Sequence, residues 1–299
     1  MIRLGIDIGG TKTHAVAVDE RATVLADALV ASGRGPAAVV RCAEEAARRA
    51  AGLAGVPLTE VASIGVGIPG SVDRETGRVS HAVNLDIEEL ALGHELGERL
   101  GRPVVVENDV KAAALGAFHL EAHTGSMAYL NLGTGLAAGL VLDGRLWRGR
   151  DGVAGEIGHI PVRPDGVLCR CGQRGCLETM ASGSGIARRW PAAQGHGVAA
   201  LFDAADAGDA EAAAVRRDLI VGVAAAVRLL VLTTGVDLVV VGGGLTVLGE
   251  RLRDAVVSVL LEAAADSPFL ASLDLAHRVK VMPAQCPVGA VGAALVGTP

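Results

Sequence analysis

Aromatic side chains are scarce in this sequence, which contains one tyrosine, two tryptophans and three phenylalanines among 299 residues. A core built on aromatic rings is therefore excluded. Apolar residues still make up 51% of the chain, so the core must consist mainly of alanine, valine and leucine. Such a core is typical of helices packed on sheets, and the length suffices for two domains of ordinary size.

An excess of positive charge is also missing, because the net charge is −6. This argues against a surface that neutralises the phosphates of DNA or of an anionic membrane. Long apolar runs are interrupted: Arg228, Asp237 and several glycines divide residues 221–245, and the first residues form no signal-like apolar core. We expect a cytoplasmic protein whose partners are small molecules, with neither nucleic acid nor a membrane among them.

A disulfide framework is absent as well, since the chain has five cysteines, an odd number, and three of them fall within eight residues. Such clustering suits a metal site in a reducing compartment. Three thiolates and one imidazole make up the candidate ligand set, which consists of His159, Cys169, Cys171 and Cys176.

These four soft ligands match a closed tetrahedral zinc site, which leaves no position for an activating water, so we predict a structural zinc. The alternative is that the cysteines are simply buried apolar residues. Since a metal-bound imidazole has a second nitrogen free, His159 can also hydrogen-bond a ligand.

An apolar strand, a glycine turn and a second apolar strand occur twice, at residues 2–20 and 127–145. The first turn offers Asp7, Gly9, Gly10, Thr11 and Lys12, and the second offers Thr134 and Gly135. Backbone N–H groups in such turns approach phosphate oxygens closely, because glycine has no Cβ. An ordinary hairpin explains either turn alone. The repetition predicts a duplicated protein with a cleft between its halves and a phosphate ligand that touches both turns.

Helical and strand patterns alternate along the rest of the chain, as in α/β proteins. We predict helices at 36–54, 86–100, 109–120, 177–189, 210–232 and 248–264, and strands at 62–68, 103–106, 238–241 and 279–282. The halves become an N-terminal domain of residues 1–117 and a C-terminal domain of residues 118–286. A last helix at about 287–299 is expected to pack back on the first domain.

Two further motifs follow predicted strands. Glu107, Asn108 and Asp109 stand at a strand end, where a carboxylate can accept a proton from a substrate hydroxyl; the alternative is a simple helix cap. Gly242–Gly244 follows another strand but lacks the spacing and the later acidic residue of a dinucleotide fingerprint. We assign Gly243 and Gly244 to the nucleotide end of the cleft, and a close strand-to-helix packing turn remains the alternative.

The order and spacing of these motifs resemble the ROK family of bacterial sugar kinases and repressors, from residue 2 to the end of the chain. The resemblance rests on seven motifs: Asp7–Lys12, Gly67–Gly70, Glu107–Asp109, Leu132–Gly135, Gly155–His159, Cys169–Glu178 and Val241–Gly244. The chain departs from the family pattern at Leu136–Gly139, where the family often has Ile-Gly-x-Gly, and at Ala117, where the family often has Glu.

The resemblance implies an α/β, actin-like/ribonuclease H-like duplicated two-domain ATPase fold, with a sugar at the base of the interdomain cleft and ATP with Mg²⁺ across it. Asp109 matches the catalytic base. The matching sugar contacts are Gly70, Asn108, Asp109, Glu156, His159 and Glu178. The matching phosphate and nucleotide contacts are Asp7, Gly9, Gly10, Thr11, Lys12, Thr134, Gly135, Gly243 and Gly244.

In the family that the sequence resembles, members with a run like Glu178–Ser182 are most often assigned glucose, while N-acetylglucosamine, N-acetylmannosamine, fructose and other hexoses stay open. Polyphosphate is a less favoured donor than ATP. A sugar-responsive repressor is the rival from another class, but the Asp7 turn begins at once, where repressors carry a helix-turn-helix. A silent sugar sensor is the other rival, and it needs no base such as Asp109. We further expect a homodimer or homotetramer.

Overall fold

The computed structural model describes residues 1–191 and 197–297, which form two compact units. Unit 1 comprises Met1–His123, Leu146–Val153 and the described part of Pro287–Pro299, and unit 2 comprises Thr124–Arg145 and Ala154–Cys286. The predicted boundary after residue 117 falls inside a helix, α3 (Asp109–Leu120), so the division lies later in the chain. Residues 146–153 belong to unit 1, which the sequence did not predict.

Two five-stranded sheets are present, and they have the same strand order. Unit 1 has the order β3-β2-β1-β4-β8, formed by β3 (Val24–Ala31), β2 (Lys12–Val18), β1 (Arg3–Ile8), β4 (Ser63–Ile68) and β8 (Val104–Asn108). The second sheet has the order β11-β10-β9-β12-β13, formed by β11 (Arg145–Trp147), β10 (Leu136–Leu142), β9 (Met127–Leu132), β12 (Leu238–Gly242) and β13 (Val279–Val281). In both, an antiparallel hairpin is extended by two parallel strands. The repeated glycine turns are the turns of these two hairpins.

Helices supply the other layers, and valine, leucine and alanine fill the space between layers. Unit 1 has α1 (Pro36–Leu53), α2 (Leu92–Leu100), α3 and α10 (Val288–Val296). Unit 2 has α4 (Leu177–Met180), α5 (Gly183–Arg189), α6 (Gly197–Asp206), α7 (Ala210–Thr234), α8 (Glu250–Ala265) and α9 (Pro268–Ser272). None of the helices in residues 1–191 and 197–297 is both long enough and apolar enough to cross a membrane.

Two predicted helices are wrong in part. Residues 86–100 begin as a strand, β7 (Ile87–Leu90), which pairs with β6 (Arg78–Ala82) beside β5 (Ser71–Asp73) in a small antiparallel sheet. Ile87 and Leu90 are buried three residues apart, a spacing that also fits a helix, and the pairing with β6 decides the outcome. Residues 177–189 form two helices, because the Ser182 hydroxyl accepts the Gly185 N–H at 3.0 Å and starts α5.

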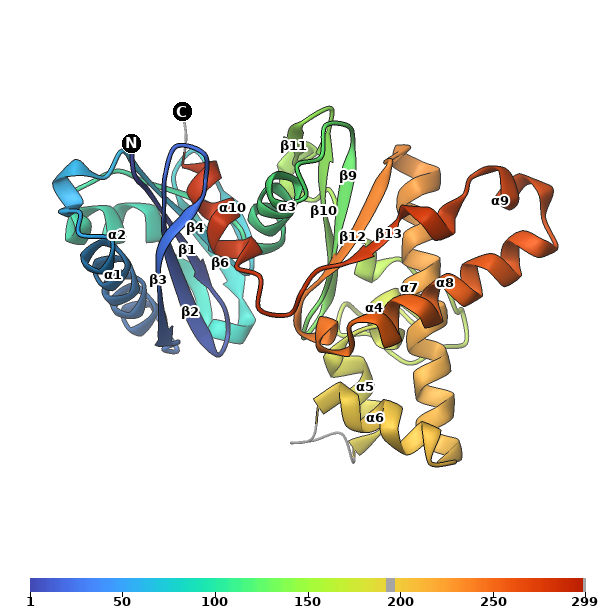
Figure 1. The fold of residues 1–299 in the computed structure, drawn as a ribbon. Coiled ribbons are helices and arrows are strands. Elements are labelled where there is room, and N and C mark those ends of the chain that lie inside the picture. Colours follow the sequence, from blue (N-terminus) through green and yellow to red (C-terminus); the bar gives the residue numbers. More distant parts are fainter. Residues whose placement is uncertain (192–196, 298–299) are drawn as a thin grey trace. The chain divides into compact units, whose positions relative to one another are not determined.

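The C-terminal helix α10 packs against β1, β4 and α3, so the two ends of the sequence meet in unit 1 (Figure 1). Glycines make this approach possible. A Cβ added at Gly65 would lie 1.9 Å from the Ala293 carbonyl oxygen, and one added at Gly292 would lie 1.7 Å from the Ala112 carbonyl oxygen. Since α3 begins with Asp109, this contact also fixes the helix that carries the candidate base.

Replacing Gly292 with alanine is expected to destabilise unit 1 by about 1–3 kcal/mol, because the new methyl group meets the backbone of α3, which cannot turn away. Thermal denaturation should show a lower Tm. Gly52→Ala is the matched control: it lies in α1, a Cβ there meets nothing within 4 Å, and removing helical glycine normally stabilises by about 0.5–1 kcal/mol. Equal Tm changes in the two variants would contradict the close packing of α10.

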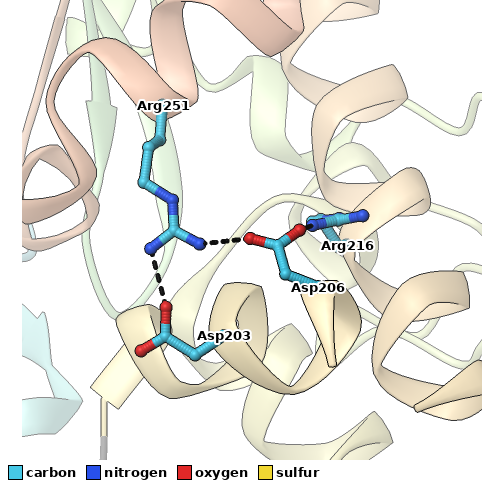
Figure 2. Close-up of polar contacts among 4 residues, drawn as sticks. All are labelled: Asp203, Asp206, Arg216 and Arg251. Carbon is cyan, nitrogen blue, oxygen red and sulfur yellow. Dashed lines mark hydrogen bonds and ion pairs between the residues drawn. The ribbon is translucent and has the colours of Figure 1, made fainter. Parts of the chain in front are cut away.

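In unit 2, an ion-pair network fastens α6 to its neighbours (Figure 2). Arg251 on α8 donates to Asp203 at 2.8 Å and to Asp206 at 2.7 Å, and Arg216 on α7 also pairs with Asp206. Both guanidinium groups also lie over the ring of Phe202, with Cζ 5.4 and 5.7 Å from its centroid. Because these charges are largely exposed, orientation of α6 is their main effect, and each pair adds little stability.

Candidate active site

In unit 1 the first glycine turn follows β1 directly and is fixed by backbone and hydroxyl contacts. The Gly9 N–H donates to the Lys12 carbonyl at 3.0 Å, and the Ser32 hydroxyl donates to the Gly9 carbonyl at 2.6 Å. Gly10, Thr11 and Lys12 are exposed. The turn therefore presents a rigid, open backbone of the kind that accommodates phosphate oxygens.

Asp7 lies just before this turn, opposite Gly67 on the parallel strand β4. Its side chain touches α10: a Cβ added at Gly289 would lie 2.4 Å from Asp7 Oδ2. Although the residue keeps some exposed surface, burial raises its pKa to about 7, the charge of Asp109 also raises it, and Lys12 opposes the shift. Because this pKa lies above the ordinary 3.8, the stability contributed by protonated Asp7 is lost as pH rises through about 7. A carboxyl group whose pKa is raised by burial and by a neighbouring charge is typical of functional sites.

Asn108 and Asp109 stand where β8 ends and α3 begins. The Asn108 carboxamide oxygen accepts the N–H groups of Val110 at 3.1 Å and Lys111 at 3.2 Å, which makes Asn108 the N-cap. Its amide nitrogen donates to the Gly70 carbonyl at 3.3 Å. The cap predicted as the alternative is thus real, and it orients the next residue. Asp109 is the first residue of α3 and lies close enough to Asp7 to affect its pKa.

The second glycine turn, in unit 2, is braced by a glutamate. The Gly133 N–H donates to the Gly135 carbonyl at 3.1 Å, and the Leu136 N–H donates to Glu178 Oε2 at 3.1 Å. A Cβ at Gly135 would lie only 2.5 Å from the same carboxylate oxygen. Glu178, at the start of α4, therefore lies directly against the turn.

Residues 155–159 pack on β10 by means of two glycines. A Cβ added at Gly155 would lie 1.8 Å from the Ala138 carbonyl oxygen, and one at Gly158 would lie 1.9 Å from the Leu136 carbonyl oxygen. The spacing Gly-x-x-Gly thus lets this loop lie flat on the strand. Glu156 is exposed and His159 is half-buried, so both remain available to a ligand.

The candidate zinc ligands lie together, as the structure describes them. The ligand atoms of His159, Cys169, Cys171 and Cys176 all fall within 4.8 Å of one another. Cys171 Sγ is 3.6 Å from Cys176 Sγ, and Cys169 Sγ is 3.8 Å from His159 Nδ1. With a Zn–S bond of about 2.3 Å, the edge of a tetrahedral site measures about 3.6–3.8 Å. The donor set and these separations fit a tetrahedral metal ion.

The third glycine turn follows β12. Gly243 has φ 89°, which favours glycine, and a Cβ there would lie 2.7 Å from Asn131 Oδ1. A Cβ at Gly133 would lie 3.3 Å from Asn131 Nδ2. The Asn131 side chain therefore lies between the second and third glycine turns. Gly244 is exposed, with no heavy atom within 4 Å of an added Cβ.

The model of the ROK family matches residues 3–296. The chain belongs to the ROK family. Among its curated relatives, the glucokinase of Streptomyces coelicolor is 39% identical over 189 residues, which are 62% of this chain and 58% of that protein. The aligned segment thus spans less than two thirds of that relative.

Solved structures of ROK proteins cover nearly the whole chain. The crystal structure of a ROK hexokinase from Thermus thermophilus has a TM-score of 0.83 and 32% identity, over 99% of this chain and 98% of that one. The structure of a ROK family glucokinase from Streptomyces griseus in complex with glucose and AMPPNP has a TM-score of 0.79 and 32% identity, over 99% of each chain. The predicted actin-like, duplicated two-domain α/β fold is confirmed.

The duplication of this ROK chain extends to individual residues. Asp7 on β1 lies opposite Gly67 on β4, and Asn131 on β9 lies opposite Gly242 on β12. Asn131 is thus the counterpart of Asp7, with an amide in place of the carboxylate. Asn131 was not among the predicted site residues, although an alignment of the two hairpin segments with each other would have revealed the correspondence.

Two other residues near the site were missed. Gly289 belongs to an apolar helix in which small residues recur, and this pattern is the signal that was available. Arg148 pairs with buried Glu107 at 2.7 Å across 41 residues of sequence. No local pattern reveals such a long-range partner.

Proposed function

We propose that this chain is an ATP-dependent hexose kinase and that glucose, converted to glucose 6-phosphate, is its substrate. The observation that carries the proposal is the placement of Asp109, at the first turn of α3 after a parallel strand, oriented by the Asn108 cap and close to Asp7. The resemblance to the Streptomyces griseus glucokinase, whose structure contains glucose and AMPPNP, an ATP analogue, supports the choice of substrates.

Asp109 acts as the general base in this proposal. Its carboxylate takes the proton of the sugar hydroxyl at C6 while the hydroxyl oxygen attacks the γ-phosphorus of ATP. The new P–O bond forms as the bond to the β–γ bridging oxygen breaks, and ADP leaves. General-base assistance of this kind contributes about 10²- to 10⁴-fold.

The proposed sugar contacts are Gly70, Asn108, Asp109, Glu156, His159 and Glu178. Among them, Asn108 already donates a hydrogen bond to the Gly70 carbonyl. Since His159 Nδ1 faces the thiols, its Nε2 is the nitrogen that bonds a sugar hydroxyl.

The nucleotide is bound by the glycine turns. The proposed contacts are Asp7, Gly9, Gly10, Thr11, Lys12, Thr134, Gly135, Gly243 and Gly244. Backbone N–H groups and the Lys12 ammonium stabilise the charge that develops on the phosphoryl oxygens. The carboxylate of Asp7 fits a hard cation, and Mg²⁺ would supply charge neutralisation at the phosphates when bound.

His159, Cys169, Cys171 and Cys176 hold a structural Zn²⁺ in this proposal. Its role is to fix the loop that presents Glu156 and His159. The pKa of Cys171 is lowered to about 6 by hydrogen bonds from Gln173, which favours the thiolate that binds metal. The homodimer or homotetramer expected from the sequence stays a prediction, which light scattering of the purified protein can test.

An assay that couples ADP formation to NADH oxidation tests the function. Purified protein should consume ATP with glucose, and the panel should include N-acetylglucosamine, N-acetylmannosamine, fructose and mannose at equal concentrations. We expect the highest kcat/KM with glucose. A higher kcat/KM with another hexose would correct the proposed substrate. If no sugar in the panel stimulates ADP formation, the proposed kinase activity is rejected.

Gly135→Ala should raise the KM for the sugar about tenfold. The new methyl group meets Glu178 Oε2 at 2.5 Å, and the carboxylate can swing away only by giving up the Leu136 N–H and its place beside the sugar. Loss of one hydrogen bond to a charged group costs about 1.5–3 kcal/mol. Steady-state kinetics with Gly52→Ala as control measures this effect, and an unchanged sugar KM would contradict the role of Glu178.

A further inference from the structure

Glu107 is a buried carboxylate to which the proposed reaction gives no role. It is 3% exposed and stands at the end of β8, one residue before Asn108. Its Oε1 accepts the backbone N–H of Asn108 at 3.0 Å, and its Oε2 accepts the Nε–H of Arg148 at 2.7 Å. A buried charge is tolerated only when it is paired and hydrogen-bonded, so the partner of Glu107 matters.

Arg148 comes from a part of the chain that leaves unit 2 and returns to it. Residues 146–153 belong to unit 1, where the turn Arg150–Gly152 packs against β5. The chain then runs into residues 155–159, which carry two of the proposed sugar contacts. The ion pair of Arg148 with Glu107 therefore fastens this crossing segment at the end of β8.

A continuous series of contacts leads from Arg148 to the candidate base. Glu107 holds the peptide N–H of Asn108, and the Asn108 side chain caps α3 and donates to Gly70. Asp109 is the next residue. If Glu107 moves or becomes hydrated, the Asn108 N–H loses its acceptor. The peptide plane of Asn108 can then turn and change the direction of the Asp109 side chain.

We propose that Arg148 is a positioning residue for phosphoryl transfer: by neutralising buried Glu107 it holds the Asn108–Asp109 backbone in the geometry that the base requires. The proposal rests on the proposed function in one respect, since it takes Asp109 as the base. Arg148 acts on the candidate base through Glu107 and Asn108 and is not itself a proposed contact of the reacting groups.

Three variants test the mechanism of this effect. Arg148→Met should lower kcat about 10- to 100-fold, as small misplacements of reacting groups commonly do, while the KM for ATP stays within twofold. Arg148→Lys should lower kcat by a smaller factor, because lysine keeps the positive charge but lacks the Nε–H group that donates to Glu107. The double variant Glu107→Gln/Arg148→Met should regain at least fivefold over Arg148→Met. The amide carries no charge to neutralise, yet its oxygen still accepts the Asn108 N–H.

Arg150→Met is the matched control, because Arg150 lies on the same segment, is exposed and pairs with exposed Asp151. Its kcat should stay within twofold of wild type. A kcat of Arg148→Met within threefold of wild type overturns the proposal, and so does a double variant that recovers nothing. If Arg148→Met does not fold, Arg148→Lys decides: it should lower kcat, and normal turnover of this variant overturns the proposal.

Hydrogen exchange separates this inference from the proposed function, because it needs no turnover. Mass spectrometry of the sugar-free protein should show faster amide exchange in peptides that cover residues 107–111 in Arg148→Met, with slower exchange restored in the double variant. Unchanged exchange overturns the positioning role even in an active kinase. If the wild-type protein phosphorylates no hexose, the proposed function is rejected, but the effect of Arg148 on the Asn108–Asp109 backbone is not.

Discussion

Asp109→Asn should lower kcat by about 10²- to 10⁴-fold while sugar binding changes by no more than a modest factor. The amide has the shape of the carboxylate and keeps an oxygen for the Val110 N–H, which Asp109 Oδ1 accepts at 2.9 Å. What it loses is the ability to take the proton of the attacking hydroxyl. Steady-state kinetics gives kcat, and isothermal titration with the sugar gives the affinity.

Asp266→Asn provides the control for this substitution, since Asp266 is an exposed residue that follows α8 in unit 2. Its kinetic constants should equal those of the wild type. A kcat of Asp109→Asn within threefold of wild type would show that another group, or water, takes the proton.

Cys171→Ser should remove the zinc and raise the KM for the sugar about 10- to 100-fold, although Cys171 is not a proposed sugar contact. A hydroxyl replaces the thiolate poorly as a zinc ligand, and the loosened loop carries Glu156 and His159. Cys171 is the informative choice because it is exposed, whereas Cys169 and Cys176 are buried and their replacement also disturbs the packing. The KM for ATP should change less than threefold, since its proposed contacts lie on other segments.

Metal analysis by mass spectrometry accompanies the kinetics. Wild-type protein purified without chelators should contain one zinc per chain, and Cys42→Ser, on α1 in unit 1, should keep both the zinc and the sugar KM. Less than half an equivalent of zinc in the wild type counts against the site. A Cys171→Ser protein without zinc but with a normal KM for the sugar would show that the metal loop does not influence sugar binding.

Much of the fold was predictable from local sequence patterns. The two glycine turns were predictable because a short apolar strand on each side leaves the turn chemistry unambiguous, and the shared strand order of the units follows from that repetition. The ligand set of His159 and three cysteines was predictable because its members are close in sequence. The strand at Ile87–Leu90 was not, because its buried positions fit a helix equally well and only pairing with β6 separates the two.

Contacts between distant segments account for what the sequence analysis missed. Gly289 and Gly292 are ordinary glycines of an apolar helix until α10 is seen against Asp7 and α3. Arg148 is one arginine among many until its Nε is found beside Glu107. The motif Glu107–Asp109 was correctly placed at a strand end, but what holds it there comes from another part of the chain.

Identification of the product is the decisive test of the proposed reaction. Purified wild-type protein is incubated with glucose, ATP and Mg²⁺, and the mixture is followed by ³¹P NMR. We expect a resonance of glucose 6-phosphate that grows in equal amount with ADP, and no such growth with Asp109→Asn. ADP that appears with inorganic phosphate instead of a sugar phosphate, or phosphorylation at a carbon other than C6, would contradict it.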